Sequence, residues 1–472
     1  MLRWLSLVAV ALIVLVSAVE LVWDLTPLEQ LRTALGKAGD GGKKGETATT
    51  VIRLGIAAWQ MDEFPWEDAI RRYEQAHGGR VKIHHSVLPE GSLNSILLLW
   101  ALQGKTKYDV VVAWADEEIH PFIDYNWNTP DPARRGLIIN VRDYLTPQQL
   151  EAFAPALFGG CSRKGPQAGE TLLYELPWMG EVLALNYNKV FFKERGIERP
   201  PRTWEEVEQV CQKLKGLTHN GVEVAPLAMV FAQGGFFAQN CYIPLLAAYK
   251  RGRGIVDEQG RPDVASPEAV EVFKTLKRWH QAGYVSRNCM VAESIEQDLR
   301  VLRAAMYPHW QSRGLWAVKD HGEEVIGIAP TPGAKVAGSL VCTYGCVIPK
   351  CSPVTREAVD FCYETFCTDT YGFQTAVSKG WSDPHRPGVL KGGGKMPVIR
   401  EMYKRADLPA GILELGKSLD KGYSYPDPAN WGQCSEILAV EFQKYLSGTT
   451  PTADEALESV RRRLAAEVYA DK

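Results

Sequence analysis

The sequence lacks an excess of charge of either sign, and it lacks the cysteine pairs of metal-binding motifs. Its 53 lysines and arginines stand against 56 aspartates and glutamates, for a net charge of -3. No global positive field therefore exists to hold nucleic acid or an anionic membrane surface. The ten cysteines include no Cys-x-x-Cys pair, which argues against zinc ribbons and thioredoxin-like redox motifs. We expect no nucleic-acid partner, no metal ion and no cofactor.

The usual catalytic signatures are also missing. No G-x-S-x-G elbow, H-E-x-x-H pair or G-x-x-x-x-G-K-S/T loop occurs, so the hydrolase, zinc-protease and P-loop interpretations lose their usual support. Asp116, Glu117 and Glu118 could supply the paired carboxylates of glycosidic chemistry. Three consecutive acids are more typical of a solvated loop. The sequence therefore predicts no catalytic residue.

The composition that remains is typical of a folded soluble protein. Of the 472 residues, 46% are apolar and 23% are charged. At about 150 residues per domain, a chain of this length holds about three domains. The 14 tryptophans, 18 tyrosines and 14 phenylalanines offer many flat apolar faces.

The N-terminal segment, residues 1–23, is predicted to be a signal peptide or a membrane anchor. An uncharged run from Trp4 to Val19 follows Arg3 and ends at Glu20. Its length as a helix, about 24 Å, is short of the roughly 30 Å hydrocarbon core, as in a secretory signal. Leu21 to Trp23 could extend it into an uncleaved anchor. Either way we expect an exported protein, periplasmic or on the outer face of the cytoplasmic membrane. Residues 24–50, rich in glycine and charge, read as a flexible tether.

The body of the chain alternates strands and helices. Val51–Trp59 is a buried-strand pattern, and Pro65 then opens a helix with an apolar face. Strands separated by helices of this length predict an open α/β sheet. Thr203 and Thr452 precede helices at capping-box spacing, and Ser266-Pro267 opens another. Further strands are predicted at 81–88, 108–114, 182–187, 226–231, 325–329 and 340–348, and a further helix at 91–102.

Five cysteines lie close together along the chain. They are Cys342, Cys346, Cys351, Cys362 and Cys367. Because disulfides form in oxidising compartments outside the cytoplasm, we expect one or two disulfides here, with partners undetermined.

Four segments give the chain a resemblance to a known family. They are Val51–Ala76, the YDVVVAWADE stretch at Tyr108–Glu117, the long stretch Leu173–Leu214 and the segment from Ala304 to Pro349. The third contains the pattern LPW, then LNYNK, then PPRTWEE. In this order they resemble the extracellular solute-binding proteins that feed ABC sugar importers, the family that includes the maltose-binding protein.

The resemblance implies a periplasmic-binding-protein-like α/β fold, with two lobes of open sheets and a ligand cleft between them. The first lobe would hold residues 51–179 and 331–384, and the second residues 180–330 and 385–472. Chain crossings are expected at 177–183, 329–337 and 385–389. The lobes would close around a ligand by a hinge motion.

The resemblance also implies a set of ligand-binding residues. Sugars have apolar C–H faces and a rim of hydroxyls, so their receptors combine aromatic platforms with carboxylates and amides. The candidate aromatics lie near strand ends or in matched segments: Trp59, Trp114, Trp178, Phe237, Trp310, Tyr344 and Trp431. Asp116 and Glu181 would accept hydrogen bonds from ligand hydroxyls, and Arg313 would meet a carboxylate or phosphate. For any single aromatic, a role in the core is the alternative.

The function implied is binding of a polar solute, a sugar or oligosaccharide above all, and its delivery to the transmembrane subunits of an ABC permease. We expect a monomer that is not an enzyme. Two alternatives stay open: an exported glycan-active enzyme using Asp116 and Glu181, and a binding module that signals to a membrane sensor. The sequence does not name the ligand.

We predict that a chain lacking the N-terminal segment and starting near Thr50 is soluble, monomeric and folded, because the core-forming pattern begins at Val51. Gel filtration and circular dichroism would check this. Aggregation under both oxidising and reducing conditions would count against the boundary.

Overall fold

The computed structural model describes residues 49–88, 103–114, 138–164, 170–232, 235–255, 263–264, 266–291, 297–383, 385–386, 389–424 and 431–469. The chain divides into two units, Met1–Thr49 and Thr50–Lys472. The predicted segment 1–23, nearly all of the tether, the helix at 91–102 and Asp116 lie outside the described residues. Within the described part of the chain, no helix has the length and apolar character needed to cross a membrane.

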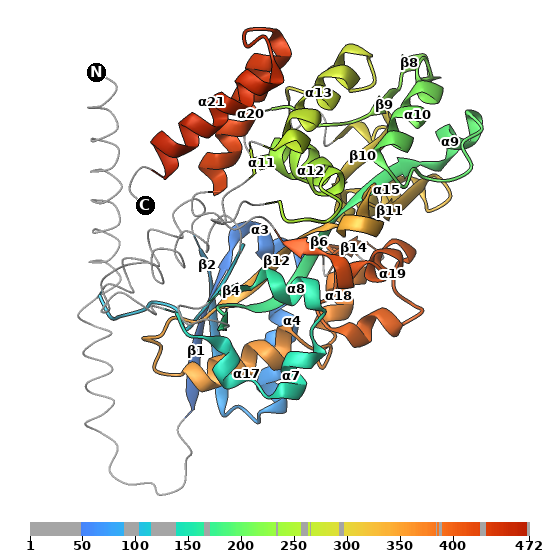
Figure 1. Ribbon diagram of the computed structural model, residues 1–472. Helices are drawn as coiled ribbons and strands as arrows, with labels where there is room; N and C mark the ends of the chain where they lie inside the picture. The colour runs from blue at the N-terminus through green and yellow to red at the C-terminus, as the bar shows by residue number, and fades with distance from the viewer. Residues whose placement is uncertain are drawn as a thin grey trace, which may run out of the picture. The chain divides into compact units, whose positions relative to one another are not determined.

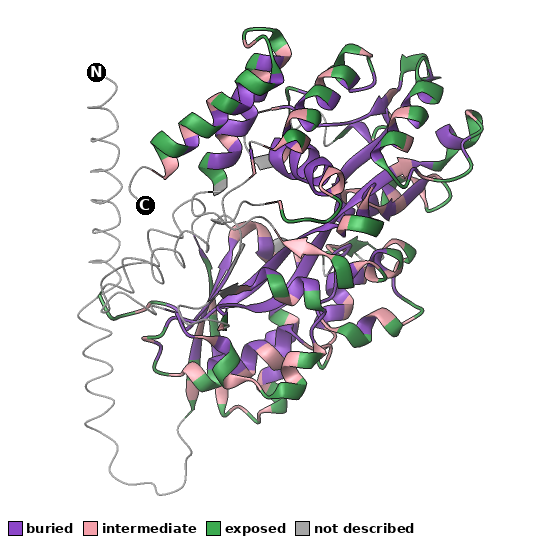
Figure 2. Cartoon of the chain, in the orientation of Figure 1, coloured by how far each residue is buried: buried purple, intermediate pink, exposed green. Residues whose placement is uncertain are grey.

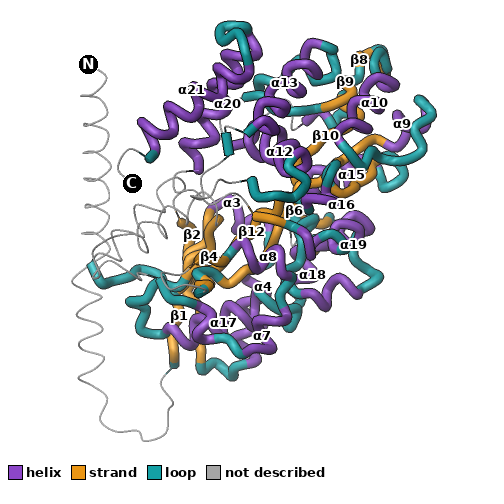
Figure 3. Tube along the Cα trace, viewed as in Figure 1, coloured by secondary structure: helices purple, strands orange, loops and turns teal. Residues whose placement is uncertain are grey.

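A nine-stranded mixed sheet organises the second unit (Figures 1 and 3). Its main path runs β2-β1-β3-β12-β6-β10-β9, with β11 beside β6 and β15 beside β12. The strands β1, β2 and β3 are parallel, and β12 is antiparallel to both β3 and β6. The bounds are β1 Thr50–Ala57, β2 Val81–Leu88, β3 Val110–Trp114, β6 Leu176–Asn188, β9 Ala225–Leu227, β10 Ala304–Trp310, β11 Ile326–Pro330, β12 Leu340–Val347 and β15 Tyr423–Ser424. Three short hairpins pair β4 (Ser162–Lys164) with β5 (Thr171–Leu173), β7 (Thr218–His219) with β8 (Val222–Glu223), and β13 (Trp381–Ser382) with β14 (Leu390–Lys391).

Helices flank these strands. Their bounds are α3 Ala58–Glu63, α4 Trp66–Ala76, α7 Pro147–Ala152, α8 Pro155–Gly160, α9 Lys189–Glu194, α10 Trp204–Leu214, α11 Gly235–Phe237, α12 Ile243–Tyr249, α13 Pro267–Gln281, α15 Gln311–His321, α16 Ala334–Ala337, α17 Thr355–Phe366, α18 Phe373–Lys379, α19 Ala410–Gly416, α20 Trp431–Ser447 and α21 Ala453–Arg463. Shorter helical turns are η3 Val141–Tyr144, η4 Ala238–Tyr242, η5 Arg400–Lys404, η6 Leu419–Lys421 and η7 Leu464–Val468. Figure 2 shows the buried residues along the strands and the exposed residues on the outer helices.

The strand β6 belongs to two groups of strands. Its first half, Leu176–Val182, pairs with β12, and its second half, Leu183–Asn188, pairs with β10 and β11. All but one of its 13 residues are buried. A strand covered on both faces needs a nearly continuous apolar sequence, which LPWMGEVLALNYN supplies apart from its central Glu181 and its C-terminal end. The segment 177–183, where a chain crossing is predicted, lies at the junction of these two halves, and both the crossing and the lobe boundaries stay predictions.

Several predicted elements are confirmed. Strand β2 has the predicted bounds, and the side chains of Thr203, Ser266 and Thr452 each accept a hydrogen bond from a backbone N–H in the first turn of α10, α13 and α21. The first strand is shorter than predicted. It ends at Ala57, and Trp59 lies in α3, because the sequence AWQMDE consists largely of strong helix formers.

The prediction of disulfides is wrong. All ten cysteines are free thiols, and nine of them are buried. Cys346 in β12 and Cys362 in α17 lie in the main core, where cysteine packs as a small apolar side chain. Burial raises the pKa of the Cys346 thiol well above its ordinary value. It also raises the pKa of the Cys362 thiol.

We therefore predict that a thiol reagent titrates ten cysteines in the denatured protein. In the native protein, Cys351 should react first, because it is the one cysteine that is only partly buried. The measurement is a thiol titration with and without denaturant. Fewer than ten reactive thiols after denaturation would contradict the structure and restore the disulfides.

Candidate functional site

Two segments that are distant in the sequence contact the centre of β6, so that three segments meet there. The two are the first turn of α15 and the stretch 392–396. The amide of Gln311 joins all three, because its Oε1 accepts a hydrogen bond from the backbone N–H of Val182 at 2.5 Å and its Nε2 donates to the carbonyl of Gly394 at 3.0 Å. Gly180 and Met396 also exchange two backbone hydrogen bonds, of 2.8 and 3.0 Å.

A close approach of α15 to β6 makes this meeting possible. Gly314 faces the side chain of Asn186, and a Cβ at Gly314 would lie 2.0 Å from Asn186 Oδ1. Any larger residue at position 314 would push the helix away from the strand. Asn186 in turn donates from Nδ2 to the carbonyl oxygens of Tyr307 and His309, at 3.2 and 3.3 Å.

A buried ion pair occupies the centre of the site. Lys395 Nζ lies 2.9 Å from Glu181 Oε1, and the two side chains are 5% and 4% exposed. Ser312, in the first turn of α15, donates its hydroxyl to the same oxygen. The Tyr344 hydroxyl, on β12, donates to Glu181 Oε2 at 3.5 Å. One carboxylate therefore links β6, β12, α15 and the 392–396 stretch.

Glu181 is ionised in this setting. Burial alone would raise the pKa of its carboxyl group, but the positive charges of Lys395 and Arg313 and the hydrogen bonds from Ser312 and Lys395 outweigh it and hold the pKa below the ordinary value. An ionised carboxylate can only accept hydrogen bonds. A general acid of a glycosidase needs the opposite shift, a raised pKa, so the geometry disfavours the glycan-active alternative at Glu181.

The backbone that carries Lys395 depends on glycine. Gly392, Gly393 and Gly394 all have positive φ angles, between 55° and 79°, which side chains with a Cβ rarely adopt. A Cβ at Gly392 would lie 1.9 Å from the carbonyl oxygen of Glu63, at the end of α3. The following Lys395 donates its backbone N–H to Val377 O in α18 at 3.0 Å.

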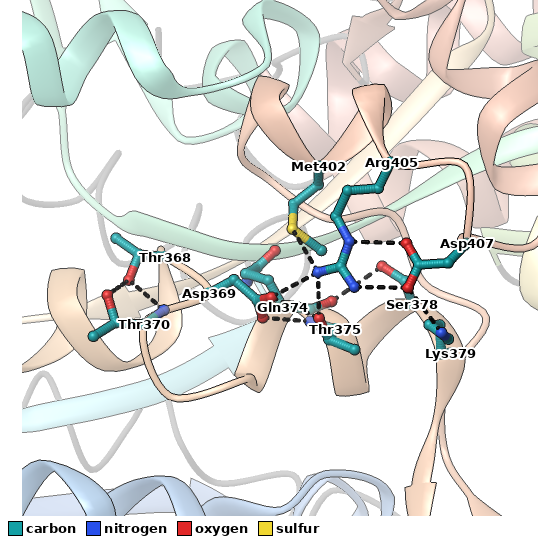
Figure 4. Close-up of polar contacts among 10 residues, drawn as sticks. All are labelled: Thr368, Asp369, Thr370, Gln374, Thr375, Ser378, Lys379, Met402, Arg405 and Asp407. Atoms are coloured by element: carbon teal, nitrogen blue, oxygen red, sulfur yellow. Dashed lines mark hydrogen bonds and ion pairs between the residues drawn. The ribbon is translucent and has the colours of Figure 1, made fainter.

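The helix α18 is itself held by a polar network at its surface (Figure 4). Asp369 accepts hydrogen bonds from the backbone N–H and the hydroxyl of Thr375, at 2.7 and 2.6 Å. Arg405 bonds to both Asp369 and Asp407, and Lys379 bonds to Asp407 at 3.0 Å. These contacts fix the helix against which Gly394 and Lys395 lie.

Aromatic rings continue outward from Glu181. Tyr344 contacts the edge of Trp59 with ring centroids 5.6 Å apart, and it lies 6.3 Å from Trp178. Trp59 is partly exposed, whereas Trp178 is fully buried against Phe64 and Trp66. The ring of Trp59 is therefore the accessible aromatic surface of this group.

A second group of rings and charges lies on α15. The Arg313 guanidinium stacks over Trp316 at 4.2 Å, and Lys395 Nζ lies 5.9 Å from the same ring. Trp310, immediately before the helix, is 5% exposed. Its backbone N–H donates to Nδ1 of His309 at 2.8 Å. Burial, with the nearby charges of Arg313 and Lys395, lowers the pKa of His309 and keeps its imidazole neutral.

The structure brings together part of the predicted set of ligand-binding residues. Trp59, Tyr344 and Glu181 form a continuous chain of contacts, with Arg313 close enough to act electrostatically on Glu181. Trp114 pairs with Tyr344 through the β3–β12 register, but its side chain lies outside the described residues, as do Asp116 and the side chain of Trp431 at the start of α20.

Two predicted residues are core residues instead. Trp178 is 0% exposed and packed among Phe64, Trp66 and Phe373. Phe237 is equally buried, stacked on Phe442 at 4.7 Å and edge-on to Phe273. Rings that are 0% exposed have no face left for a ligand in this conformation. For both residues, the structure supports the core alternative.

Three residues of the site were missed by the sequence analysis: Gln311, Ser312 and Lys395. The first two follow Trp310 directly and carry no pattern of their own. Lys395 follows three glycines in the stretch KGGGKMP. A glycine run ahead of a lone lysine was the available signal, because it indicates a backbone with special φ angles at a close contact.

Comparisons with known proteins agree with this architecture. The family model described as bacterial extracellular solute-binding protein matches residues 58–361. The fold is that of a two-lobed solute-binding protein, as the resemblance implied. The chain belongs to the bacterial extracellular solute-binding protein family, a transport family rather than an enzyme family, and its members act outside the cytoplasm.

The fold is shared with solved structures of low sequence identity. The cyclic α-maltosyl-1,6-maltose binding protein of Arthrobacter globiformis superimposes with a TM-score of 0.65 at 16% identity, covering 89% of this chain and 99% of that one. Maltose-bound MalE3 of T. maritima superimposes with a TM-score of 0.63 at 17% identity, covering 88% of this chain and 99% of that one. A solute-binding protein of Agrobacterium radiobacter in complex with ribitol superimposes with a TM-score of 0.63 at 17% identity, covering 89% of this chain and 98% of that one.

Curated relatives match a shorter stretch. Proteins of Brucella abortus and Brucella suis described as binding proteins are 22% identical over 244 residues, which is 52% of this chain and 51% of theirs. The chain thus spans about half the length of the curated relatives it matches.

We predict that Lys395→Met lowers the free energy of unfolding by about 3–5 kcal/mol, because it leaves the Glu181 carboxylate buried without its partner. Urea denaturation measures the loss. The matched control is Lys404→Met, since Lys404 pairs with Glu401 on the surface, where the two side chains are 73% and 75% exposed; this change should have little effect.

The loss should also depend on pH. In the wild-type protein, the folded-state pKa of Glu181 lies below its ordinary 4.5, so its contribution is complete above that value and is lost as the pH falls through the folded-state pKa. In Lys395→Met, burial raises the pKa, and protonation relieves the unpaired charge. The difference between the two proteins should therefore shrink on acidification. A difference that is constant between pH 7 and 4 would contradict an ionised pair.

Proposed function

We propose that the chain binds a polyhydroxylated solute, a sugar, oligosaccharide or polyol, outside the cytoplasm and delivers it to the transmembrane subunits of an ABC permease. The observation that carries the proposal is the contact chain from the ionised Glu181 through Tyr344 to the partly exposed Trp59. It combines a hydrogen-bond acceptor, a hydroxyl and an accessible aromatic ring within a few ångströms.

The chemistry of that chain suits a carbohydrate. The indole face of Trp59 offers an apolar platform for the C–H groups of a sugar ring, and the Tyr344 hydroxyl can both donate and accept. The carboxylate of Glu181 already accepts from Ser312, Tyr344 and Lys395. Its role would be to fix the orientation of the Tyr344 hydroxyl and to place a negative charge next to it, rather than to bind the ligand by itself.

The named relatives point in the same direction. Proteins of the same fold are described with bound maltose, ribitol and D-mannitol. All three ligands are rich in hydroxyl groups and carry no charge. Because this chain belongs to the bacterial extracellular solute-binding protein family, we expect a ligand of that class.

Ligand capture would follow from the two-lobed fold. With lobes at 51–179 plus 331–384 and at 180–330 plus 385–472, the centre of β6 is the natural hinge, because the strand hydrogen-bonds to both groups of strands. A ligand that contacts both lobes binds the closed state better and so shifts the population toward it. We further propose that the protein acts as a monomer and is held at the membrane, or released from it, by residues 1–23.

We predict that a panel of maltose, mannotriose, D-tagatose, ribitol and D-mannitol contains a ligand that raises the melting temperature. At 100 times its dissociation constant, a ligand adds about 2.7 kcal/mol of stability. Trp59→Ala should weaken that binding about 5- to 150-fold, as expected for about 1–3 kcal/mol of lost stacking, with calorimetry giving the affinity. No shift with any member of the panel would contradict the proposed ligand class.

The control for this variant is Trp66→Ala. Trp66 is 1% exposed and lies in the core, so its truncation should cost about 3–5 kcal/mol of stability. Trp59→Ala should leave the empty protein nearly as stable as wild type, because the ring is already partly in water. If Trp59→Ala melts as early as Trp66→Ala and binds normally, Trp59 is a core residue.

A further inference from the structure

A buried amide stands beside the accessible tryptophan. Gln60 follows Trp59 in α3, the helix that begins where β1 ends. The strands β1, β2 and β3 are parallel, and in open α/β sheets ligands bind outside the carboxyl ends of such strands. Gln60 is 0% exposed, and its backbone carbonyl accepts a hydrogen bond from Trp66 Nε1 at 2.9 Å. The backbone of this residue is thus held in place by the core.

The side chain of Gln60, in contrast, has no hydrogen-bond partner among the described residues. Both Nε2 and Oε1 are buried, and neither makes a hydrogen bond within that part of the chain. Nearly all buried polar groups in proteins are paired, because an amide removed from water without a partner destabilises the fold. An amide that is unpaired at both ends therefore calls for a partner that the described residues do not supply.

Of the other buried glutamines, Gln374 and Gln311 have amides that are paired within the protein. Gln374, also 0% exposed, donates from Nε2 to the carbonyls of Trp178 and Phe366 and accepts at Oε1 from the N–H of Val398. Gln311 uses both its oxygen and its nitrogen to join three segments. In both of these glutamines the amide is paired at its oxygen and at its nitrogen.

We propose that Gln60 is a ligand-binding residue, whose amide pairs with hydroxyl groups of the bound solute. This inference rests on the proposed function and adds a residue to it. The amide presents one acceptor and two donors in a plane. It can donate from Nε2 to one hydroxyl oxygen of a polyol while Oε1 accepts from a neighbouring hydroxyl. Trp59, one residue earlier in α3, supplies the apolar platform beside it.

A hydroxyl-binding amide and a structural amide respond oppositely to removal of polarity. Gln60→Met keeps the length of the side chain and removes an unpaired amide, so the melting temperature of the empty protein should stay the same or rise. Gln374→Met removes three hydrogen bonds and leaves two carbonyls and one N–H unpaired, so its melting temperature should fall clearly. The matched pair thus separates the two roles without any ligand.

Affinity gives the second measurement. With the member of the panel that binds the wild-type protein most tightly, Gln60→Met should weaken binding about tenfold or more, because a site built to hydrogen-bond a hydroxyl discriminates strongly when a partner is lost. Gln374→Met, measured below its own melting temperature, should bind like wild type. Calorimetry with that carbohydrate gives both values.

Each other result would overturn the inference. A fall in melting temperature for Gln60→Met as large as that for Gln374→Met would mean that the amide is satisfied inside the protein. An unchanged affinity in Gln60→Met, with wild-type binding intact, would reject the role of Gln60 while leaving the proposed function in place. If the wild-type protein binds no member of the panel, the proposed function fails, and the role of Gln60 as a hydroxyl-binding residue fails with it.

Discussion

The buried ion pair between Glu181 and Lys395 constrains how every segment around the centre of β6 can lie. A carboxylate that is almost fully withdrawn from water is costly unless its charge and its lone pairs are matched. Here the partners come from α15, β12 and the 392–396 stretch. If any of the three moved away, the charge would lose part of its compensation. The polar centre therefore fixes the relative positions of segments that an apolar core would hold less specifically.

The same requirement explains the unusual backbone around Lys395. Its ammonium group has to reach Glu181 from the stretch 392–396, which packs against both α3 and α15. Three consecutive glycines with positive φ allow that path, and Gly314 lets α15 approach β6 from the other side. Glycine at these positions allows the close approach that brings Lys395 to Glu181. The proposed hinge at the centre of β6 would change the spacing of its segments only if the ion pair were kept or replaced by ligand contacts.

The sequence predicted the elements whose signals are local. The caps of α10, α13 and α21 follow from spacing within a few residues, and Glu181 was identified through the family resemblance of the segment that contains it. Lys395 was missed because its partner lies 214 residues away, and nothing in either neighbourhood records the other. Local patterns also misled: five cysteines close in sequence suggested disulfides, although all five are free thiols and all but Cys351 lie buried in the core. Trp178 matched a family motif, but only the packing of Phe64 and Trp66 around it reveals a core ring.

Polar groups in this fold are therefore of two kinds, and the difference bears on function. Glu181, Gln311 and Gln374 are buried and satisfied, and each joins segments that are distant in the sequence. Gln60 is buried and has no side-chain hydrogen bond to any described residue, and it follows a tryptophan that is only partly buried. Satisfied groups stabilise the empty protein, whereas an unsatisfied group gains its hydrogen bonds only when something binds. Stabilisation that is available only in the bound state is what a receptor needs in order to hold its ligand and close around it.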